Sequence, residues 1–356
     1  MKEPSPAGPP SASESLAPIV RVLTKGQQPA VSPDGRKIAF SYDGNIYEMD
    51  TSVQATVTWI GGASHYDTTG GKIKLIDDDG DDFLPRWRPD GQTIGFVRSD
   101  PTESNKAWIF SVPVTGGQAI QLVFNQYAED YNYEVRWDWS PDGKYIAFFS
   151  YDDQASKESL NVVLTSNGKR VFVVQTYDVH TPSSGYGSFA WSLTPDEIAY
   201  SRQSPNPQGT GELWLVNLTS GKAINDTSGV RLVSDICRAP LDNRFAYNAT
   251  PLYTPTIELT DFSNRLNEYS VSSTGGLKWS YDEKYFLYQS VYSYDGPGPY
   301  TTTQIALFSI SKNKEYLLVS ATSFSQADLN FEWGHAPNTV YFEFGDQIAV
   351  VNFKEP

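Results

Sequence analysis

The densest group of side chains that could do chemistry is an acidic string around Gly80. Residues 76–83 read IDDDGDDF, so five carboxylates lie within six positions. Carboxylate oxygens are the ligands that Ca²⁺ prefers, although an EF-hand loop would need a further ligand at its twelfth position. The string therefore predicts either a calcium site or a solvated acidic turn. The candidate calcium ligands are Asp77, Asp78, Asp79, Asp81 and Asp82.

A second group is rich in tyrosine. Residues 291–303 read VYSYDGPGPYTTT. A tyrosine at a protein rim can anchor a protein or a sugar ring, because it combines a large apolar area with a hydroxyl group. The alternative is a loop whose tyrosines pack on neighbouring elements. Together with acidic residues expected on loops of the same face, the candidate partner-binding residues are Tyr292, Tyr294, Asp295, Tyr300, Asp152, Asp153, Glu129 and Asp130.

The chain has only three histidines, His65, His180 and His335. A metal or acid–base centre would need them to converge with carboxylates. The repeat pattern described next places them in different parts of the fold. The sequence therefore names no catalytic residue and favours a protein that is not an enzyme. A metal-assisted polysaccharide lyase or a hydrolase, with carboxylates at a channel mouth, is the alternative.

The elements that must position these groups come from a repeat. Seven ten-residue segments align without a gap, and each ends in an aromatic residue; they begin at Val31, Trp87, Trp139, Trp191, Arg238, Trp279 and Trp333. Their spacing, about 40 to 56 residues, suits one propeller blade each. Three segments contain Pro-Asp-Gly, in which proline presets φ, aspartate bonds the backbone ahead and glycine adopts a left-handed conformation. These turns are Pro33, Asp34 and Gly35; Pro89, Asp90 and Gly91; and Pro141, Asp142 and Gly143.

Each segment supplies two strands of a hairpin, and a third and usually a fourth apolar strand follow. In the strand after the turn, alternation puts Ile146 and Phe148 on one face and Ala147 on the other. The last copy has only three strands, whereas residues 19–23, IVRVL, precede the first copy without a blade of their own. We expect this strand to complete the last blade and close the ring. The prediction is an all-β, seven-bladed β-propeller of four-stranded antiparallel blades over residues 19–356, after a Pro/Ser/Ala-rich tether over residues 1–18.

The Trp-Ser-Pro-Asp-Gly-x-x-Ile-Ala-Phe module, complete from Trp139 to Phe148, resembles the repeats of TolB-like propellers. Such repeats also occur in the propeller domains of prolyl-oligopeptidase and dipeptidyl-peptidase relatives. The resemblance covers nearly everything after residue 18 and implies the fold, which hosts many activities. TolB carries an α/β domain ahead of its propeller, and the peptidases carry a Gly-x-Ser-x-Gly elbow, which is absent here. Some pectin-degrading lyases use a related propeller with clustered histidines around a metal, a feature this chain lacks.

Composition limits the partners. The 356 residues carry a formal net charge of -15, which argues against nucleic acid because a backbone binder needs a basic face. The single cysteine, Cys237, allows no intrachain disulfide, and its apolar neighbours predict a buried thiol. No apolar run is long enough for a transmembrane segment. The tether suggests an exported, periplasmic or cell-surface protein, with a lipid anchor as one option. We expect a monomer that binds a protein or polysaccharide partner; the sequence identifies no cofactor with certainty, and calcium is the candidate.

Overall fold

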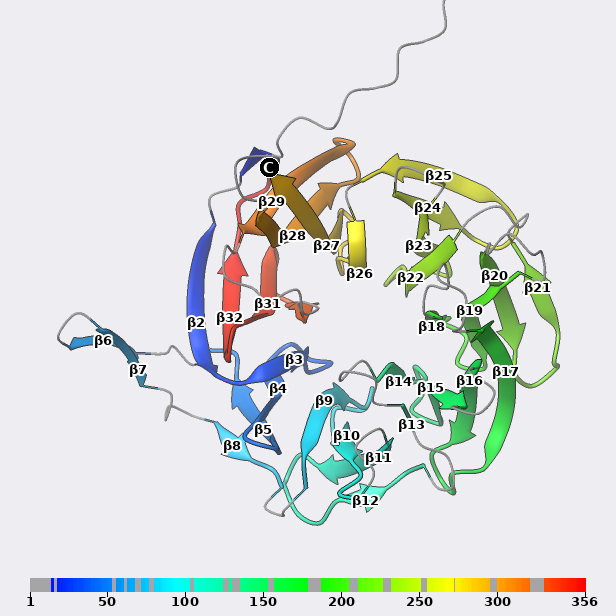
Figure 1. Cartoon of the computed structure of the whole chain (residues 1–356), viewed down its shortest axis with the longest axis horizontal. Coiled ribbons are helices and arrows are strands. Elements are labelled where there is room, and N and C mark those ends of the chain that lie inside the picture. Colours follow the sequence, from blue (N-terminus) through cyan, green and yellow to red (C-terminus); the bar gives the residue numbers. More distant parts are fainter. Residues whose placement is uncertain are drawn as a thin grey trace, which may run out of the picture.

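Seven separate β-sheets follow one another around a central axis in the computed structural model (Figure 1). The structure describes residues 14–15, 18–52, 56–60, 63–67, 72–76, 80–102, 106–123, 128–129, 135–152, 157–178, 187–204, 211–226, 232–250, 255–271, 273–294, 300–320 and 330–356. Each sheet is one antiparallel blade, so the predicted seven-bladed propeller is confirmed. Within these residues there is no helix long and apolar enough to cross a membrane.

The blades are numbered along the chain, and their strands are given from the channel outward. Blade 1 holds β3 (Gln27–Val31), β4 (Lys37–Tyr42), β5 (Asn45–Asp50) and β8 (Ile73–Lys74). Blade 2 holds β9 (Asp82–Trp87), β10 (Thr93–Ser99), β11 (Lys106–Pro113) and β12 (Ile120–Gln121). Blade 3 holds β14 (Trp137–Trp139), β15 (Tyr145–Asp152), β16 (Lys157–Leu164) and β17 (Arg170–Asp178). Blade 4 holds β18 (Phe189–Trp191), β19 (Glu197–Gln203), β20 (Gly211–Asn217) and β21 (Ala223–Asn225).

The remaining blades follow the same order. Blade 5 holds β22 (Leu232–Arg238), β23 (Phe245–Thr250), β24 (Thr256–Thr260) and β25 (Arg265–Ser270). Blade 6 holds β26 (Ser273–Trp279), β27 (Tyr285–Tyr294), β28 (Tyr300–Ser309) and β29 (Lys314–Ser320). Blade 7 holds β30 (Phe331–Trp333), β31 (Thr339–Phe344) and β32 (Gln347–Asn352), and its outermost strand is β2 (Ile19–Lys25).

The N-terminal strand closes the ring as predicted. β2 pairs antiparallel with β32, from Ile19 opposite Asn352 to Lys25 opposite Gln347. The side chain of Leu23 is 2% exposed and packs between blade 7 and blade 1. The last blade therefore combines the two ends of the chain, and in Figure 1 the first and last colours lie side by side there.

Three small elements are additions that the repeat pattern does not reveal. β1 (Glu14–Ser15), within the segment predicted as a tether, pairs parallel with β29 at the outer edge of blade 6. β6 (Thr56–Ile60) and β7 (Ala63–Asp67) form a hairpin of their own between β5 and β8. β13 (Ala128–Glu129) pairs with β11 beside β12.

The turns between the first and second strands have the geometry that their residues require. Gly35, Gly91 and Gly143 have φ of +72°, +68° and +67°, a left-handed conformation that glycine adopts without steric cost. The Asp34 carboxylate accepts a hydrogen bond of 3.1 Å from the N–H of Arg36. These turns lie on one face of the propeller, which we call the turn face; the opposite face is the loop face.

The hydrophobic core is divided into seven clusters, one between each pair of neighbouring blades. Ile146 and Phe148 pack toward blade 2, whereas Ala147 packs toward blade 4, as the alternation predicts. Gly95 shows how close the blades lie: a Cβ atom there would be 2.5 Å from the Trp137 ring and 2.7 Å from the Trp139 ring. The blades are held by face-to-face packing of large side chains on small ones.

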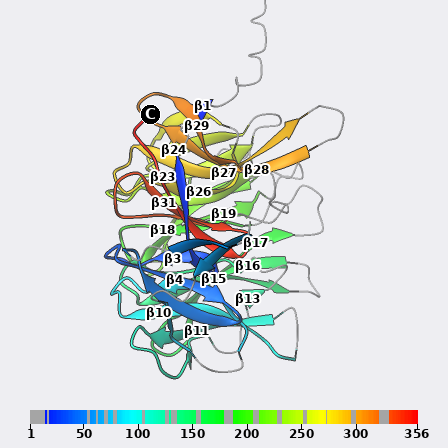
Figure 2. The same ribbon diagram turned by 90° about the vertical axis from the view of Figure 1, so that its left-hand side faces the viewer.

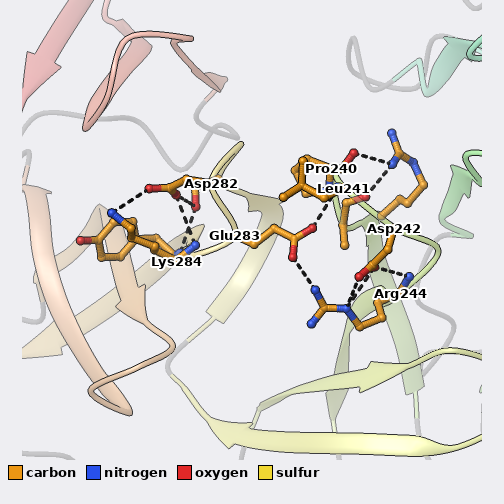
Figure 3. A network of polar contacts seen from close by, with 11 residues as sticks. Pro240, Leu241, Asp242, Arg244, Asp282, Glu283 and Lys284 are labelled. Carbon is orange, nitrogen blue, oxygen red and sulfur yellow. Dashed lines mark hydrogen bonds and ion pairs between the residues drawn. The ribbon is translucent and has the colours of Figure 1, made fainter.

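Polar contacts also join neighbouring turns. Between blades 5 and 6, Arg244 pairs with Asp242 of its own turn and with Glu283 of the next, and Glu283 accepts a hydrogen bond of 2.9 Å from the N–H of Leu241 (Figure 3). Between blades 4 and 5, the Ser192 hydroxyl donates to Asn243 at 2.9 Å. The turn face is therefore linked from blade to blade as well as packed.

Candidate functional site

The central channel collects four charged side chains from four blades. Arg86, Asp138, Lys278 and Glu332 occupy the same repeat position, directly before the first module residue, on the inner strands β9, β14, β26 and β30. Asp138 lies within electrostatic reach of Arg86 and also of Lys278 and Glu332. Blade 3 and blades 6 and 7 are not neighbours, so the four side chains must converge across the axis. We call these four residues the channel layer.

One pair in the channel layer is closed. The Lys278 ammonium group on blade 6 lies 2.6 Å from a carboxylate oxygen of Glu332 on blade 7. The two side chains are 29% and 22% exposed, so the ion pair is partly shielded from water. Each group neutralises the other.

The other pair is open. Arg86 on blade 2 and Asp138 on blade 3 form no ion pair or hydrogen bond with each other's side chains, and no described residue accepts a hydrogen bond from the Arg86 guanidinium group. The Nε atom of Arg86 is buried and lacks a partner within the described part of the chain. Asp138 accepts one hydrogen bond, 2.8 Å from the N–H of Trp139.

Burial beside the channel raises the pKa of Asp138, and the positive charge of Arg86 opposes this shift. The side chain of Asp138 is exposed toward the lumen, but protein surrounds the lumen and displaces part of the water that would solvate a carboxylate. The open pair is therefore a guanidinium group and a carboxylate that are both incompletely satisfied.

The backbone around the open pair is fixed. The indole N–H of Trp139 donates to the carbonyl oxygen of Arg86 at 3.3 Å, and Trp87 makes the same contact with Ala30 of blade 1 at 2.9 Å. Each tryptophan thereby ties its inner strand to the preceding one. The inner strands that carry Arg86 and Asp138 are thus joined by this hydrogen bond and by the packing between blades 2 and 3.

A ring of backbone bulges lies next to the channel layer, three residues before the module start in four blades. The residues there have positive φ: Gln28 (56°), Leu84 (50°), Asp235 (49°) and Gly276 (70°). The Gln28 side chain accepts a hydrogen bond of 2.8 Å from the N–H of Leu84, and Asp235 accepts one of 3.0 Å from the N–H of Gly276. Bulges re-aim side chains and are common beside functional sites. Here they also cross-link the inner strands.

Comparison with known proteins supports the fold. No protein-family model matches the chain. It is 31% identical over 145 residues to the "Uncharacterized peptidase YuxL" of Bacillus subtilis (strain 168), a match covering 38% of this chain and 18% of that protein. The chain therefore spans less than a fifth of this relative's length.

Solved structures extend the likeness to the whole ring. An oligogalacturonate lyase in complex with manganese has a TM-score of 0.64 at 12% identity, over 94% of this chain and 91% of that one. An oligogalacturonate lyase from Vibrio parahaemolyticus has a TM-score of 0.63 at 12% identity, over 96% and 92%. TolB from Acinetobacter baumannii has a TM-score of 0.50 at 12% identity, over 82% and 62%. The similarity to TolB propellers is thus confirmed for the fold.

The predicted calcium ligands that the structure describes differ in their environment. Asp82 is buried, and its two carboxylate oxygens accept hydrogen bonds of 2.6 and 2.8 Å from Arg98. Asp81 is exposed, and Asp77, Asp78 and Asp79 lie outside the described residues. No group of three or more His, Cys, Asp or Glu side chains able to hold a metal occurs in the described ranges. Calcium binding stays a prediction, but Asp82 is already committed to Arg98.

Similar ion pairs strengthen the loop-face ends of the next two blades. In blade 3 Arg136 pairs with Glu158, which also accepts hydrogen bonds from the Thr176 hydroxyl and the N–H of Gly187 at 2.9 and 2.8 Å. In blade 4 Arg202 pairs with Glu212 at 3.2 Å. These carboxylates stabilise the fold, so they are not free to serve a ligand.

The predicted partner-binding residues are placed by their backbones only. Tyr292 and Tyr294 lie near the end of β27, Tyr300 begins β28, and this hairpin reaches out on the loop face (Figure 2). Asp152 ends β15 and Glu129 ends β13. The side chains of these five residues are outside the described set, and so are Asp153, Asp295 and Asp130. Their part in binding stays a prediction.

Of the three histidines, only His335 has a described side chain. His335 lies on the turn face, where its ring is 4.2 Å from that of Tyr281 in the neighbouring blade. The side chain of His65 and the whole of His180 are outside the described residues.

The channel layer was missed at the sequence level, although a signal for it exists. The residue before each module start is charged in four of the seven copies and uncharged in the other three, where Ala30, Ala190 and Cys237 pack against the clusters between blades. In a fifth copy the position holds Cys237, and burial raises the pKa of its thiol to about 12. Comparing the repeats one position before the module start would have revealed this layer.

Proposed function

We propose that this chain is a binding propeller without catalytic activity, which takes a protein or polymer partner at its loop face or in the mouth of its central channel. The observation that carries the proposal is the channel layer, where rigid inner strands hold two positive and two negative charges around one axis. Such a layer can recognise a polar partner.

The construction of the ring supports binding. Blades joined by interblade packing, bulges and turn contacts hold the channel in one shape, so a ligand would not have to order it. A preorganised site loses less free energy on association than a mobile one. The mixed charges favour selectivity, because a ligand with only one sign of charge meets repulsion from the other.

A second candidate is a metal-assisted polysaccharide lyase. It is favoured by the whole-chain structural likeness to two oligogalacturonate lyases, one of them in complex with manganese. A lyase of that class abstracts a proton next to a carboxylate and expels the glycosidic oxygen, which leaves a carbon–carbon double bond. Its activity would be visible as ultraviolet absorbance of the product.

One preparation tests both candidates. The chain is incubated with oligogalacturonate and Mn²⁺ while absorbance is followed, and in parallel it is run through affinity electrophoresis in gels of neutral and uronate polysaccharides and over an immobilised peptide array. Binding without turnover supports the binding propeller. Turnover above a protein-free control overturns it in favour of the lyase, and absence of both binding and turnover also overturns it.

Export, a lipid anchor and calcium belong to the same proposal. An exported propeller would be recovered in the periplasmic or surface fraction of its source cells, and an anchored one would partition into detergent. If calcium binds at the acidic string, a chelator lowers the thermal midpoint; an unchanged midpoint rejects the calcium site.

A further inference from the structure

The open and closed pairs of the channel layer are built from equivalent positions on neighbouring blades. Lys278 and Glu332 meet at 2.6 Å, whereas Arg86 and Asp138 do not pair, although Arg86 has the longer reach and the more adaptable donor geometry. Opposite charges left apart beside a partly desolvated lumen cost free energy that a direct contact would recover. This difference between the two pairs is explained if a ligand group binds between Arg86 and Asp138.

Arg86 defines one end of that group. A guanidinium group offers five N–H donors in a planar fork, and here none donates to a described residue. A carboxylate is the acceptor that matches this fork with two parallel hydrogen bonds. The end of the ligand beside Arg86 is therefore a carboxylate.

Asp138 defines the other end. Its carboxylate accepts only the Trp139 N–H and faces the lumen, so it would repel a simple anion bound at Arg86. Lys278 and Glu332 cancel each other and do not alter this balance. The ligand must therefore carry a hydrogen-bond donor close to its carboxylate.

We infer that Arg86 and Asp138 form a binding site for a carboxylate with an adjacent N–H donor, the chemistry shared by a free α-amino acid and by the C-terminal residue of a peptide. The carboxylate lies against Arg86, and the ammonium or amide N–H donates to Asp138. This site rests on the proposed binding function and specifies the end group that enters the channel.

Four small probes separate these possibilities by ligand-observed NMR titration of the full chain. Glycine carries an ammonium group, N-acetylglycine carries the amide N–H of a peptide C-terminus, acetate lacks a donor, and N-acetylglycinamide lacks the carboxylate. We expect glycine or N-acetylglycine to bind at least tenfold more tightly than the other two. Preference between the first two distinguishes a free amino acid from a peptide end.

Substitutions of Arg86 and Asp138 test whether the probes bind at this pair. Arg86→Gln is expected to lower affinity at least tenfold, and Asp138→Asn to remove the advantage of the donor-bearing probe over acetate. Lys222→Gln and Asp346→Asn change exposed charges elsewhere and serve as controls with unchanged affinity. Should Arg86→Gln fail to fold, Arg86→Lys keeps the charge without the planar fork and is expected to bind with intermediate affinity.

Three results would overturn the site: acetate binding as tightly as glycine and N-acetylglycine, affinities unchanged in both pair variants, or no binding of any probe up to about 0.1 M, which corresponds to about 1.4 kcal/mol. Such a failure leaves the proposed function standing if the chain still retains its polysaccharide or peptide partner. If the wild-type protein binds no polysaccharide or peptide partner, the proposed function itself fails.

Discussion

The closed pair Lys278–Glu332 and the open pair Arg86–Asp138 share a repeat position, a strand type and a lumen, yet only the first forms an ion pair. The closed pair joins blades 6 and 7, the region where the two chain ends meet in one sheet. The open pair joins blades 2 and 3, where large tryptophans fill the interface and Trp139 fixes the Arg86 backbone. Equivalent positions in a repeat can therefore serve different ends: one pair reinforces an interface, and the other is left for a ligand.

The largest expected effect comes from breaking the ring on which both pairs depend. Deleting residues 19–23 removes the outer strand of blade 7 and should destabilise the protein by more than about 3 kcal/mol, since loss of a buried leucine such as Leu23 alone costs about 2–5 kcal/mol. Urea unfolding followed by circular dichroism measures the loss. Val20→Ser, at an outward-facing site on the same strand, is the matched control and should leave the midpoint unchanged. A deletion with wild-type stability would refute closure by this strand.

Removing one member of the closed pair should come next. Lys278→Met leaves the partly buried Glu332 carboxylate unpaired, and we expect a loss of about 1–2 kcal/mol. A double-mutant cycle with Glu332→Met should give a coupling free energy of about 1 kcal/mol. A coupling indistinguishable from zero would mean that the short contact adds nothing to stability.

The same double-mutant cycle on the open pair should give a smaller coupling free energy. Arg86→Met and Asp138→Asn should couple more weakly than the closed pair, since their charges interact at a distance without direct contact. Denaturant titrations of the four proteins under identical salt provide the value. Coupling as large as that of the closed pair would show that Arg86 and Asp138 pair in solution, and the proposed ligand site would then lose its basis.

Much of the fold follows from the residues themselves. Pro-Asp-Gly specifies the tight turn, the aromatic end of each module specifies a buried strand, and the surplus strand before Val31 specifies closure. The β6–β7 hairpin could not be foreseen, because it lies in an insertion that has no counterpart in the described parts of the other blades.

The site was harder to predict, for a physical reason. The repeat alignment shows that Arg86 and Asp138 hold the same position in neighbouring blades, but whether two such charges touch depends on how far blade packing separates their strands. The same holds for Asp82: the string IDDDGDDF suggests a metal ligand, whereas the fold brings Arg98, sixteen residues away, to both of its oxygens. Local sequence identifies the groups, and tertiary packing selects their partners.

A smaller effect is expected from the open pair on the pH dependence of the free energy of unfolding, and it comes from Asp138. Because burial raises the pKa of Asp138 above its ordinary value of 3.8, the folded state binds more protons than the unfolded state just above that pH. The contribution of Asp138 to the free energy of unfolding therefore falls as pH rises from about 4 through the raised pKa, and is constant beyond it. Asp138→Asn should flatten this decline in urea titrations between pH 4 and 7. A decline of equal size in the variant would assign it to other groups.

The smallest expected difference is between two variants in the reactivity of Cys237. Cys237 holds the equivalent repeat position on blade 5 and packs against the cluster between blades 5 and 6; burial raises the pKa of its thiol to about 12, while the charge of Lys278 partly opposes the shift. At pH 8 the native thiol should react with iodoacetamide about a thousandfold more slowly than in urea, because only the thiolate is nucleophilic. Lys278→Met should slow it further, since the opposing charge is gone, whereas Arg86→Gln should not. Equal rates in both variants would show that Cys237 does not sense the closed pair and that the two halves of the channel layer are less distinct than their geometry indicates.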